Sequence, residues 1–271
     1  EGRQVLRVLL GVDATQPLGD ERLRVAVGLE LPQNPLSLLA DPGDAGIEGA
    51  VVANEVLDAM PVHRFRMAES GLEEQCVACE GGELRAGWMP ARRPLQEAVD
   101  RLGLELPSGY VSEINLRLQP WIGELGRLIS RGAALLVDYG YERRDYYSPD
   151  RNSGTLLCHY RHHANTDPLY LPGMQDITAH VDFTAVAEAA DSAGLAVSGY
   201  TSQAAFLLGC GIEQMLEGMA QKQDAEWFAL VEGFKRLVLP TEMGERFRVM
   251  ALTRGLQTAP EGFTQDMRFR L

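Results

Sequence analysis

The chain has 271 residues, of which 45% are hydrophobic, and its formal net charge is −13. This size and composition suit a globular protein with a full hydrophobic core, whereas the acidic balance argues against sequence-independent binding to nucleic-acid phosphates. No run of 18 apolar residues occurs, so the sequence predicts no membrane-spanning helix.

Two apolar runs near the amino terminus predict strands, over residues 5–12 and 23–29. Each is followed by an acidic residue, Asp13 and Glu30 respectively. An acid at the end of such a strand can bind the ribose of a nucleotide cofactor. The glycines before residue 49 form no tight Gly-x-Gly pattern between a strand and a helix, which is the usual phosphate- or cofactor-binding turn.

Residues 49–62 combine a buried strand with a cluster of polar groups. The apolar run 50–53 does not alternate, which favours a parallel strand covered on both faces, and Asn54, Glu55 and Asp58 follow it. If the next residues form one helical turn before Pro61, these three side chains share a face. Ligands of open α/β sheets bind at such strand ends. The alternative is that Asn54 caps the turn and the acids are solvated.

The next segment predicts a β insertion. Short antiparallel strands are expected over residues 62–67, 73–79 and 84–89. Cys76 and Cys79 form a Cys-x-x-Cys pair, which is typical of half a zinc site or a redox pair, but no second pair follows. We therefore expect a plain hairpin and no metal site.

Helices are predicted over residues 95–102 and 116–130, the second ended by Gly132. The apolar run 133–137 then predicts another buried parallel strand, which delivers Asp138 to the same sheet edge as Asn54 and Glu55. Asp138 could contact a ligand there, or it could cap a helix or stabilise a turn.

Residues 139–181 have little regular pattern and are rich in Tyr, His, Asp, Pro and Gly. Long loops of this kind usually cover a site or bind a ligand. Their histidines lack partners at a fixed spacing, so a metal is not expected. Asp182 reads as the N-cap of a helix over residues 183–193, which leaves Asp176 and His180 as the functional candidates in this segment.

The last third predicts a strand over residues 196–201, helices within residues 203–237, and a late strand over residues 246–252. The late strand fits an antiparallel position inside an otherwise parallel sheet. Phe206 lies at the start of the helical part, where a helix could close over a substrate.

Seven segments carry a family resemblance: residues 49–62, 109–115, 135–141, 154–163, 172–183, 203–212 and 240–249. Together, and in this order, they resemble the MidA-type family of class I S-adenosylmethionine-dependent methyltransferases. The resemblance implies an α/β fold with a class I methyltransferase (Rossmann-like) sheet. It also implies one domain over residues 1–271, with a β insertion near 62–89 and helical insertions near 94–130 and 203–237.

Mitochondrial members of this family methylate an arginine of a respiratory complex I subunit. The resemblance therefore implies S-adenosyl-L-methionine as cofactor and a protein substrate bearing an arginine, and an acidic surface suits such a basic partner. We expect no nucleic-acid or membrane partner, and a homodimer is an open option. The expected location is the bacterial cytoplasm, or the mitochondrial matrix in a eukaryote.

Candidate site residues follow from strand ends and from the resemblance. Carboxylates can pair with a guanidinium and accept its proton, so the predicted catalytic residues are Glu55, Asp58 and Glu113. The predicted cofactor-binding residues are Asn54, Glu55 and Asp138. The predicted substrate-binding or lid residues are His159, Asp176, His180 and Phe206.

The family also carries a Gly-rich cofactor turn after a long amino-terminal segment, and the sequence shows no such turn. We therefore expect a shortened member, a divergent member, or a sequence that lacks an amino-terminal part of the protein. Two function classes stay open: a protein arginine methyltransferase, and a catalytically impaired member that acts as a binding or assembly factor. Methylation of a small molecule is a third, weaker option.

Overall fold

A computed structural model describes residues 25–26, 46–80, 82–161, 163–219 and 225–271. The strand predicted over residues 5–12 lies outside the described residues, as do Asp13 and Glu30. Of the strand predicted over residues 23–29, Val25–Ala26 is described, as β1.

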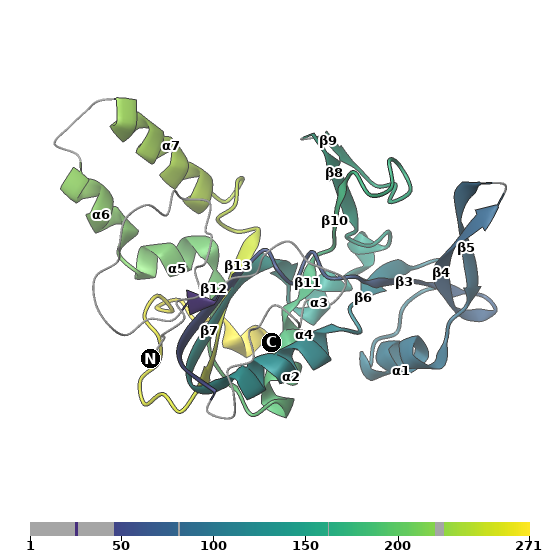
Figure 1. Cartoon of the computed structure of the whole chain (residues 1–271), viewed down its shortest axis with the longest axis horizontal. Helices are drawn as coiled ribbons and strands as arrows, with labels where there is room; N and C mark the ends of the chain where they lie inside the picture. Colours follow the sequence, from purple (N-terminus) through teal and green to yellow (C-terminus); the bar gives the residue numbers. More distant parts are fainter. Residues whose placement is uncertain (1–24, 27–45, 81, 162, 220–224) are drawn as a thin grey trace, which may run out of the picture.

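A mixed sheet forms the centre of the fold, and three of its neighbouring strands are parallel (Figure 1). In spatial order its strands are β1, β2 (Ile47–Asn54), β7 (Ile129–Tyr141), β13 (Phe247–Arg254) and β12 (Ala196–Ser202), with β11 (Val181–Asp182) paired to the end of β7. Strand β13 is antiparallel to both of its neighbours. This confirms the predicted α/β fold and the late antiparallel strand.

Two helices cover one side of this sheet and pack against each other, α2 (Leu118–Leu128) and α4 (Phe183–Ser192) (Figure 1). Their buried side chains, Ile122 and Val186 among them, join Leu136 of β7 in the main hydrophobic core. The predicted helical part near the carboxyl terminus comprises three helices that lie away from α2 and α4: α5 (Gln203–Gly209), α6 (Ile212–Met219) and α7 (Ala225–Val238).

The antiparallel strands predicted within residues 62–89 are present. Strands β3 (His63–Ala68), β4 (Gly71–Glu80) and β5 (Glu83–Pro90) are antiparallel, and β6 (Val111–Ile114), which the sequence did not reveal, pairs with β3. Helix α1 (Arg93–Arg101) joins β5 to β6, and a second core forms around Phe65, Leu95 and Tyr110. Cys76 and Cys79 are free and lie three apart in β4, which places them on opposite faces of the strand.

The structure corrects the prediction around Gly132. Helix α2 ends at Leu128, and β7 begins at once and runs to Tyr141, so Gly132 lies within a strand instead of ending a helix. Its φ is +144°, and a side chain there would collide with the backbone of Gly49 on β2. The glycine is therefore needed for the close approach of two strands. The longer β7 also means that Asp138 lies inside the strand and not at its end.

Residues 139–181 are more regular than predicted. They contain α3 (Arg143–Tyr146), the 3₁₀ turn η2 (Pro149–Arg151), and three short strands, β8 (Leu157–Tyr160), β9 (His163–Asn165) and β10 (Asp176–Thr178). These three strands form a small antiparallel sheet, which stands up from the central sheet (Figure 1). We call residues 157–178 the flap. A further 3₁₀ turn, η3 (Arg268–Arg270), closes the chain.

Within the described ranges, no helix is both long and apolar enough to cross a membrane.

Candidate functional site

The segment after β2 is a turn and not the predicted helical turn. Glu55 has a φ of +52°, in the left-handed region, and its backbone N–H donates to the carbonyl of Val137 on β7 (2.9 Å). A non-glycine residue in this region is uncommon and is often found at functional sites. The positive φ breaks helical geometry, so the chain turns sharply where β2 ends.

Asp138 holds this turn in place. Its Oδ2 atom accepts backbone hydrogen bonds from Val56 (3.2 Å), Leu57 (2.8 Å) and Asp58 (3.3 Å), and its Oδ1 atom accepts one from Tyr139 (2.9 Å). The side chain is buried, and burial followed by the nearby Asp58 carboxylate raises the pKa of Asp138. Both oxygens are occupied by the protein's own amides, so the structure places Asp138 in support of the turn.

Asp58 is a buried acid within this turn. It is 3% exposed, and its Oδ1 atom has no hydrogen-bond partner in the described part of the chain. Its carbonyl accepts a hydrogen bond from the N–H of Ala179 (3.0 Å), which ties the turn to the segment after the flap. Burial, and then repulsion by Glu55, raise the pKa of Asp58 to about 6. Asp58 therefore exchanges a proton close to neutral pH.

A cavity of about 1170 Å³ opens between the turn, the end of β7 and the flap, and we call it the main cavity. Of the predicted site residues, it brings together Glu55, Asp58, His159, Asp176 and His180. The acids Glu55, Asp58 and Asp176 outnumber the lining cation Arg246, so the cavity favours a positively charged ligand. Asp176 and His159 are direct partners across β10 and β8, which brings them to one face of the flap.

Tyr139 and Tyr141 form an aromatic wall of the main cavity. Neither residue was predicted from the sequence. They follow Asp138 in β7, and alternation along the strand turns both to the face opposite Asp138. Tyr139 packs on Phe247, with ring centroids 3.9 Å apart, and its pKa is raised to about 12 by burial and by Glu55, Asp58 and Asp138. Its phenol therefore stays protonated at neutral pH.

His180 lies beside both rings, 5.2 Å from Tyr141 and 6.2 Å from Tyr139 between centroids. Burial, and then the charge of Arg151, lower the pKa of His180 to about 4. Its Nδ1 atom is buried and has no hydrogen-bond partner among the described residues. His180 is therefore a neutral ring with an unused polar atom at the wall of the cavity.

Glu113 is not brought together with Glu55 and Asp58. It is fully buried on β6, where it pairs with Arg64 (Oε1 to Nε, 3.3 Å) and accepts the N–H of Thr155 (2.8 Å). Burial raises the pKa of Glu113. It lines a second cavity of about 380 Å³. The Thr155 hydroxyl in turn accepts the backbone N–H of His180 (3.0 Å), so Glu113 supports the main cavity from a distance.

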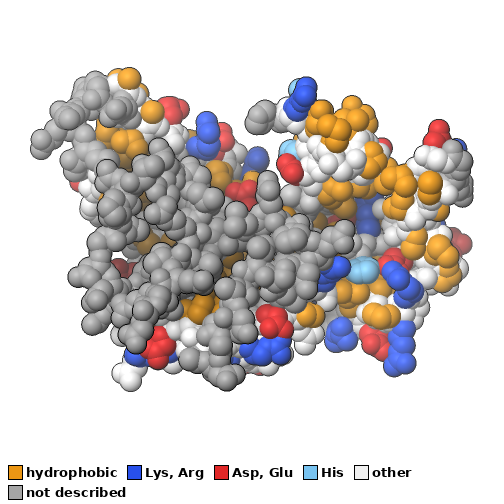
Figure 2. Space-filling view, viewed as in Figure 1, with side chains coloured by type: hydrophobic (Ala, Val, Ile, Leu, Met, Phe, Trp, Pro, Cys, Tyr) orange, Lys and Arg blue, Asp and Glu red, His pale blue; other side chains and the backbone are white. Residues whose placement is uncertain are grey.

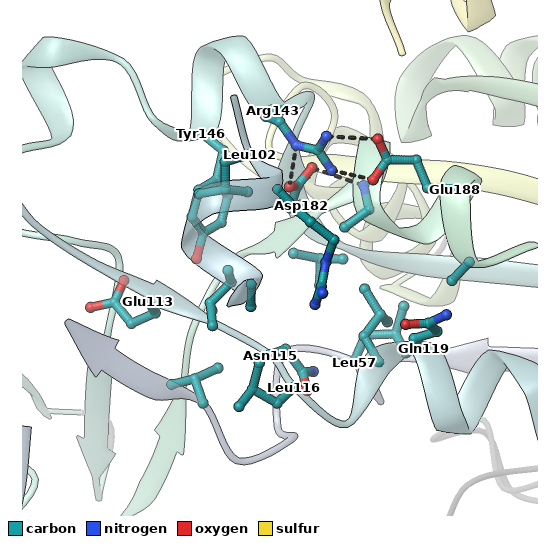
Figure 3. A pocket seen from close by; sticks show the side chains of 18 of the residues that line it. Leu57, Leu102, Glu113, Asn115, Leu116, Gln119, Arg143, Tyr146, Asp182 and Glu188 are labelled. Atoms are coloured by element: carbon teal, nitrogen blue, oxygen red, sulfur yellow. Dashed lines mark hydrogen bonds and ion pairs between the residues drawn. The ribbon is translucent and has the colours of Figure 1, made fainter. Parts of the chain in front are cut away.

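The second cavity contains a charged cluster at the end opposite Glu113, in which Arg143 lies between Asp182 and Glu188 (Figure 3). The Arg143 guanidinium donates to Asp182 (3.2 Å) and to both oxygens of Glu188 (2.7 and 2.5 Å). Asp182 also accepts the N–H of Ala185 (3.1 Å), which confirms the predicted N-cap of α4. These charges are already paired within the chain.

The remaining predicted residues lie outside both cavities. Asn54 is exposed at the end of β2, and its amide donates to the Glu55 carboxylate (3.2 Å). Phe206 packs on Phe263 in the helical part, with ring centroids 5.1 Å apart.

The exposed carboxylate of Glu55 and amide of Asn54 are the groups at the end of β2 that could hold a nucleoside cofactor. Together they accept from hydroxyl or ammonium groups and donate to a carboxylate, which are the groups that S-adenosylmethionine carries. Their position outside the carboxyl end of a parallel strand is where ligands bind in such sheets.

Comparison with known proteins identifies similar chains. Residues 32–201 match the model of a family described as "Putative S-adenosyl-L-methionine-dependent methyltransferase". The chain is 30% identical over 225 residues to the fruit-fly (Drosophila melanogaster) protein named protein arginine methyltransferase NDUFAF7 homolog, mitochondrial, covering 77% of this chain and 48% of that one. It is 32% identical over 214 residues to the Bos taurus NDUFAF7 protein, covering 74% and 44%.

Two solved structures from Burkholderia thailandensis are also similar, each with 38% sequence identity over 86% of this chain. One has a TM-score of 0.80 and is covered over 62% of its length. The other, bound to S-adenosyl-homocysteine, has a TM-score of 0.78 and is covered over 60%. The chain spans about half the length of the curated relatives it matches, the fruit-fly and Bos taurus proteins among them.

Proposed function

The chain belongs to the family of S-adenosyl-L-methionine-dependent methyltransferases, and from this premise we propose that the protein methylates an arginine of a protein substrate. The family match confirms the resemblance drawn from the sequence. The observation that carries the proposal is Asp58, a buried carboxylate in an acidic cavity, whose Oδ1 atom has no hydrogen-bond partner among the described residues.

An arginine side chain fits the main cavity by charge and by shape. Its guanidinium is planar, keeps its positive charge at neutral pH, and donates in a fixed fork that matches carboxylates. Glu55 and Asp58 offer carboxylates, and Tyr139 offers a flat aromatic ring on which such a cation can stack. The relatives named protein arginine methyltransferases support the same acceptor.

When bound, S-adenosylmethionine supplies a methyl group on a positively charged sulfur. The transfer forms a bond from carbon to a guanidinium nitrogen and breaks the bond from carbon to sulfur, with inline geometry. The protein therefore mainly has to orient the acceptor nitrogen and exclude water. In our proposal Glu55 pairs with the guanidinium and fixes its direction.

Methylation gives the acceptor a second positive charge until one N–H proton leaves. Asp58 is the group that takes this proton, because its pKa of about 6 leaves it mostly ionised at neutral pH yet able to be protonated. Asp138 keeps the Asp58 backbone in place, and Glu113 keeps His180 in place through Thr155. Asn54 and the exposed part of Glu55 are the proposed cofactor contacts.

The family resemblance suggests a respiratory complex I subunit, or its bacterial counterpart, as the substrate. The names of the curated relatives include the word mitochondrial, which supports the matrix for a eukaryotic chain. We propose the bacterial cytoplasm as the other location.

The test uses labelled methyl transfer. The protein is incubated with S-adenosylmethionine carrying a tritiated methyl group and with a peptide that contains one arginine; the control peptide carries lysine instead. We expect label in the arginine peptide alone. Binding of the cofactor by calorimetry without any transfer would contradict the proposal and favour the binding or assembly alternative.

A further inference from the structure

The tip of the flap, residues 165–175, turns its polar groups inward. The amide of Asn165 donates to the Gln175 side chain (3.0 Å), and the Gln175 amide donates to the carbonyl of Asp167 (2.9 Å). The Asn165 oxygen accepts the N–H of Asp167 (3.0 Å), and the Asp167 carboxylate accepts the N–H of Leu169 (2.9 Å). The tip is therefore a loop whose shape is fixed by its own hydrogen bonds.

Large apolar side chains point outward from the same flap. Tyr170 is 54% exposed, Met174 is 62% exposed, and Ile177, on β10, is 43% exposed. Hydrophobic side chains gather over the flap in Figure 2. Leu171 lies between the first two with a φ of +50°, a conformation that non-glycine residues rarely adopt. Exposed apolar groups on a rigid, strained loop are typical of an interaction site.

This apolar surface continues into the main cavity. Gln175 is the last residue of the tip, Asp176 and Ile177 follow it, and all three line the cavity together with Glu55 and Asp58. A chain that places a cationic side chain against these acids would thus lie beside Ile177, three residues after Met174. The acids suit the arginine, and the exposed flap residues suit an apolar neighbour of that arginine.

We propose that Tyr170, Met174 and Ile177 form a docking surface for the protein substrate, on which an apolar side chain close in sequence to the accepting arginine packs. The inference rests on the proposed function and deepens it, because it names the kind of segment that is methylated. The occupant is a protein segment, because a free small guanidino compound would fill the acidic end of the main cavity and leave the three flap side chains uncovered.

The experiment measures peptide binding without turnover. Fluorescein-labelled nonapeptides with a central arginine are titrated into the full chain in the presence of S-adenosylhomocysteine. One peptide has alternating Gly and Ser around the arginine, and the other has Leu two residues to each side. We expect the Leu peptide to bind about tenfold more tightly, which is the effect of burying about one large apolar side chain.

The variant Met174→Gln should lose this preference, so that both peptides bind with the affinity of the Gly and Ser peptide. The matched control is Met89→Gln, because Met89 is 57% exposed on β5 and lies outside the flap. That variant should keep the tenfold preference.

Equal affinity of the wild-type protein for both peptides, or no binding of either, would overturn the docking surface. So would an equal loss in Met89→Gln, or a wild-type dimer in sedimentation that Met174→Gln dissociates, because the flap would then pack against a second copy. Failure of the proposed function is distinguishable: the Leu preference would persist in binding while no methyl group is transferred.

Discussion

Replacement of Asp58 by Asn should stabilise the protein at neutral pH while it removes the proposed proton acceptor. Burial raises the pKa of Asp58 from 3.8 to about 6, so the folded chain holds the Asp58 proton to a higher pH than the unfolded chain does. Between these two values the folded state binds more protons, and the free energy of unfolding therefore falls as the pH rises.

The size of this effect follows from the two pKa values. The difference corresponds to a penalty on the order of 3 kcal/mol, which is absent below about pH 4 and complete above about pH 6. Asparagine carries no charge to desolvate. The Asp58→Asn variant should thus match the wild type near pH 4 and exceed it by up to about 3 kcal/mol at pH 7.5.

Urea unfolding of both proteins at pH 4 and pH 7.5 measures this difference. Glu69→Gln is the control, because Glu69 is exposed in the turn between β3 and β4, outside the main cavity, and its replacement should change the unfolding free energy little. A variant that is no more stable than the wild type at pH 7.5, or that shows the same dependence on pH, would refute the view that Asp58 is a strained, buried carboxylate.

Three further predictions concern the same site. Glu55→Gln should abolish methyl transfer to the arginine peptide without unfolding the protein, since it removes the carboxylate that pairs with the guanidinium; unchanged turnover would exclude Glu55 from the mechanism. Asp138→Ala should lower the free energy of unfolding by about 2–5 kcal/mol in urea titrations, because four backbone N–H groups lose their acceptor. The wild-type kcat/KM should rise with pH as Asp58 ionises near pH 6, and a profile that is flat from pH 5 to 8 would contradict its role as proton acceptor.

The sequence pattern located the end of β2 well, because a buried strand that stops at polar residues is a local signal. It could not show the conformation of the turn, which depends on hydrogen bonds between Asp138 and backbone groups about 80 residues earlier. Local spacing made a helical turn equally plausible. Glu55, whose φ is positive, donates its backbone N–H to the carbonyl of Val137 on β7, a contact that no spacing encodes.

Tyr139 and Tyr141 were missed because an aromatic residue after a buried strand usually belongs to the core. Their place in the cavity depends on β7 continuing past Asp138 to Tyr141, whereas the apolar run in the sequence ends at Val137. Glu113 was proposed as a catalytic residue from segment 109–115 of the family resemblance. The structure places it at the second cavity, where it contacts Arg64 and Thr155, tertiary contacts that the sequence does not show.

The flap was expected as an irregular lid because its strands have only three or four residues and carry little apolar alternation. His159, Asp176 and His180 were named as candidates because polar residues in a long loop are often functional, and all three line the main cavity. Phe206, predicted as a lid residue, lines neither of the two cavities in the structure. Helix α5 packs through it on Phe263, a residue far along the chain.

The central claim is that a guanidinium binds against the buried Asp58 carboxylate, and proton release on binding tests it most directly. Calorimetric titration of the arginine peptide near pH 6, with S-adenosylhomocysteine present and in buffers of different ionisation enthalpy, counts the protons exchanged. The cation should lower the pKa of Asp58, so the wild type should release a fraction of a proton per peptide and Asp58→Asn should release none. Equal proton release by the two proteins, or none by the wild type, would contradict the account.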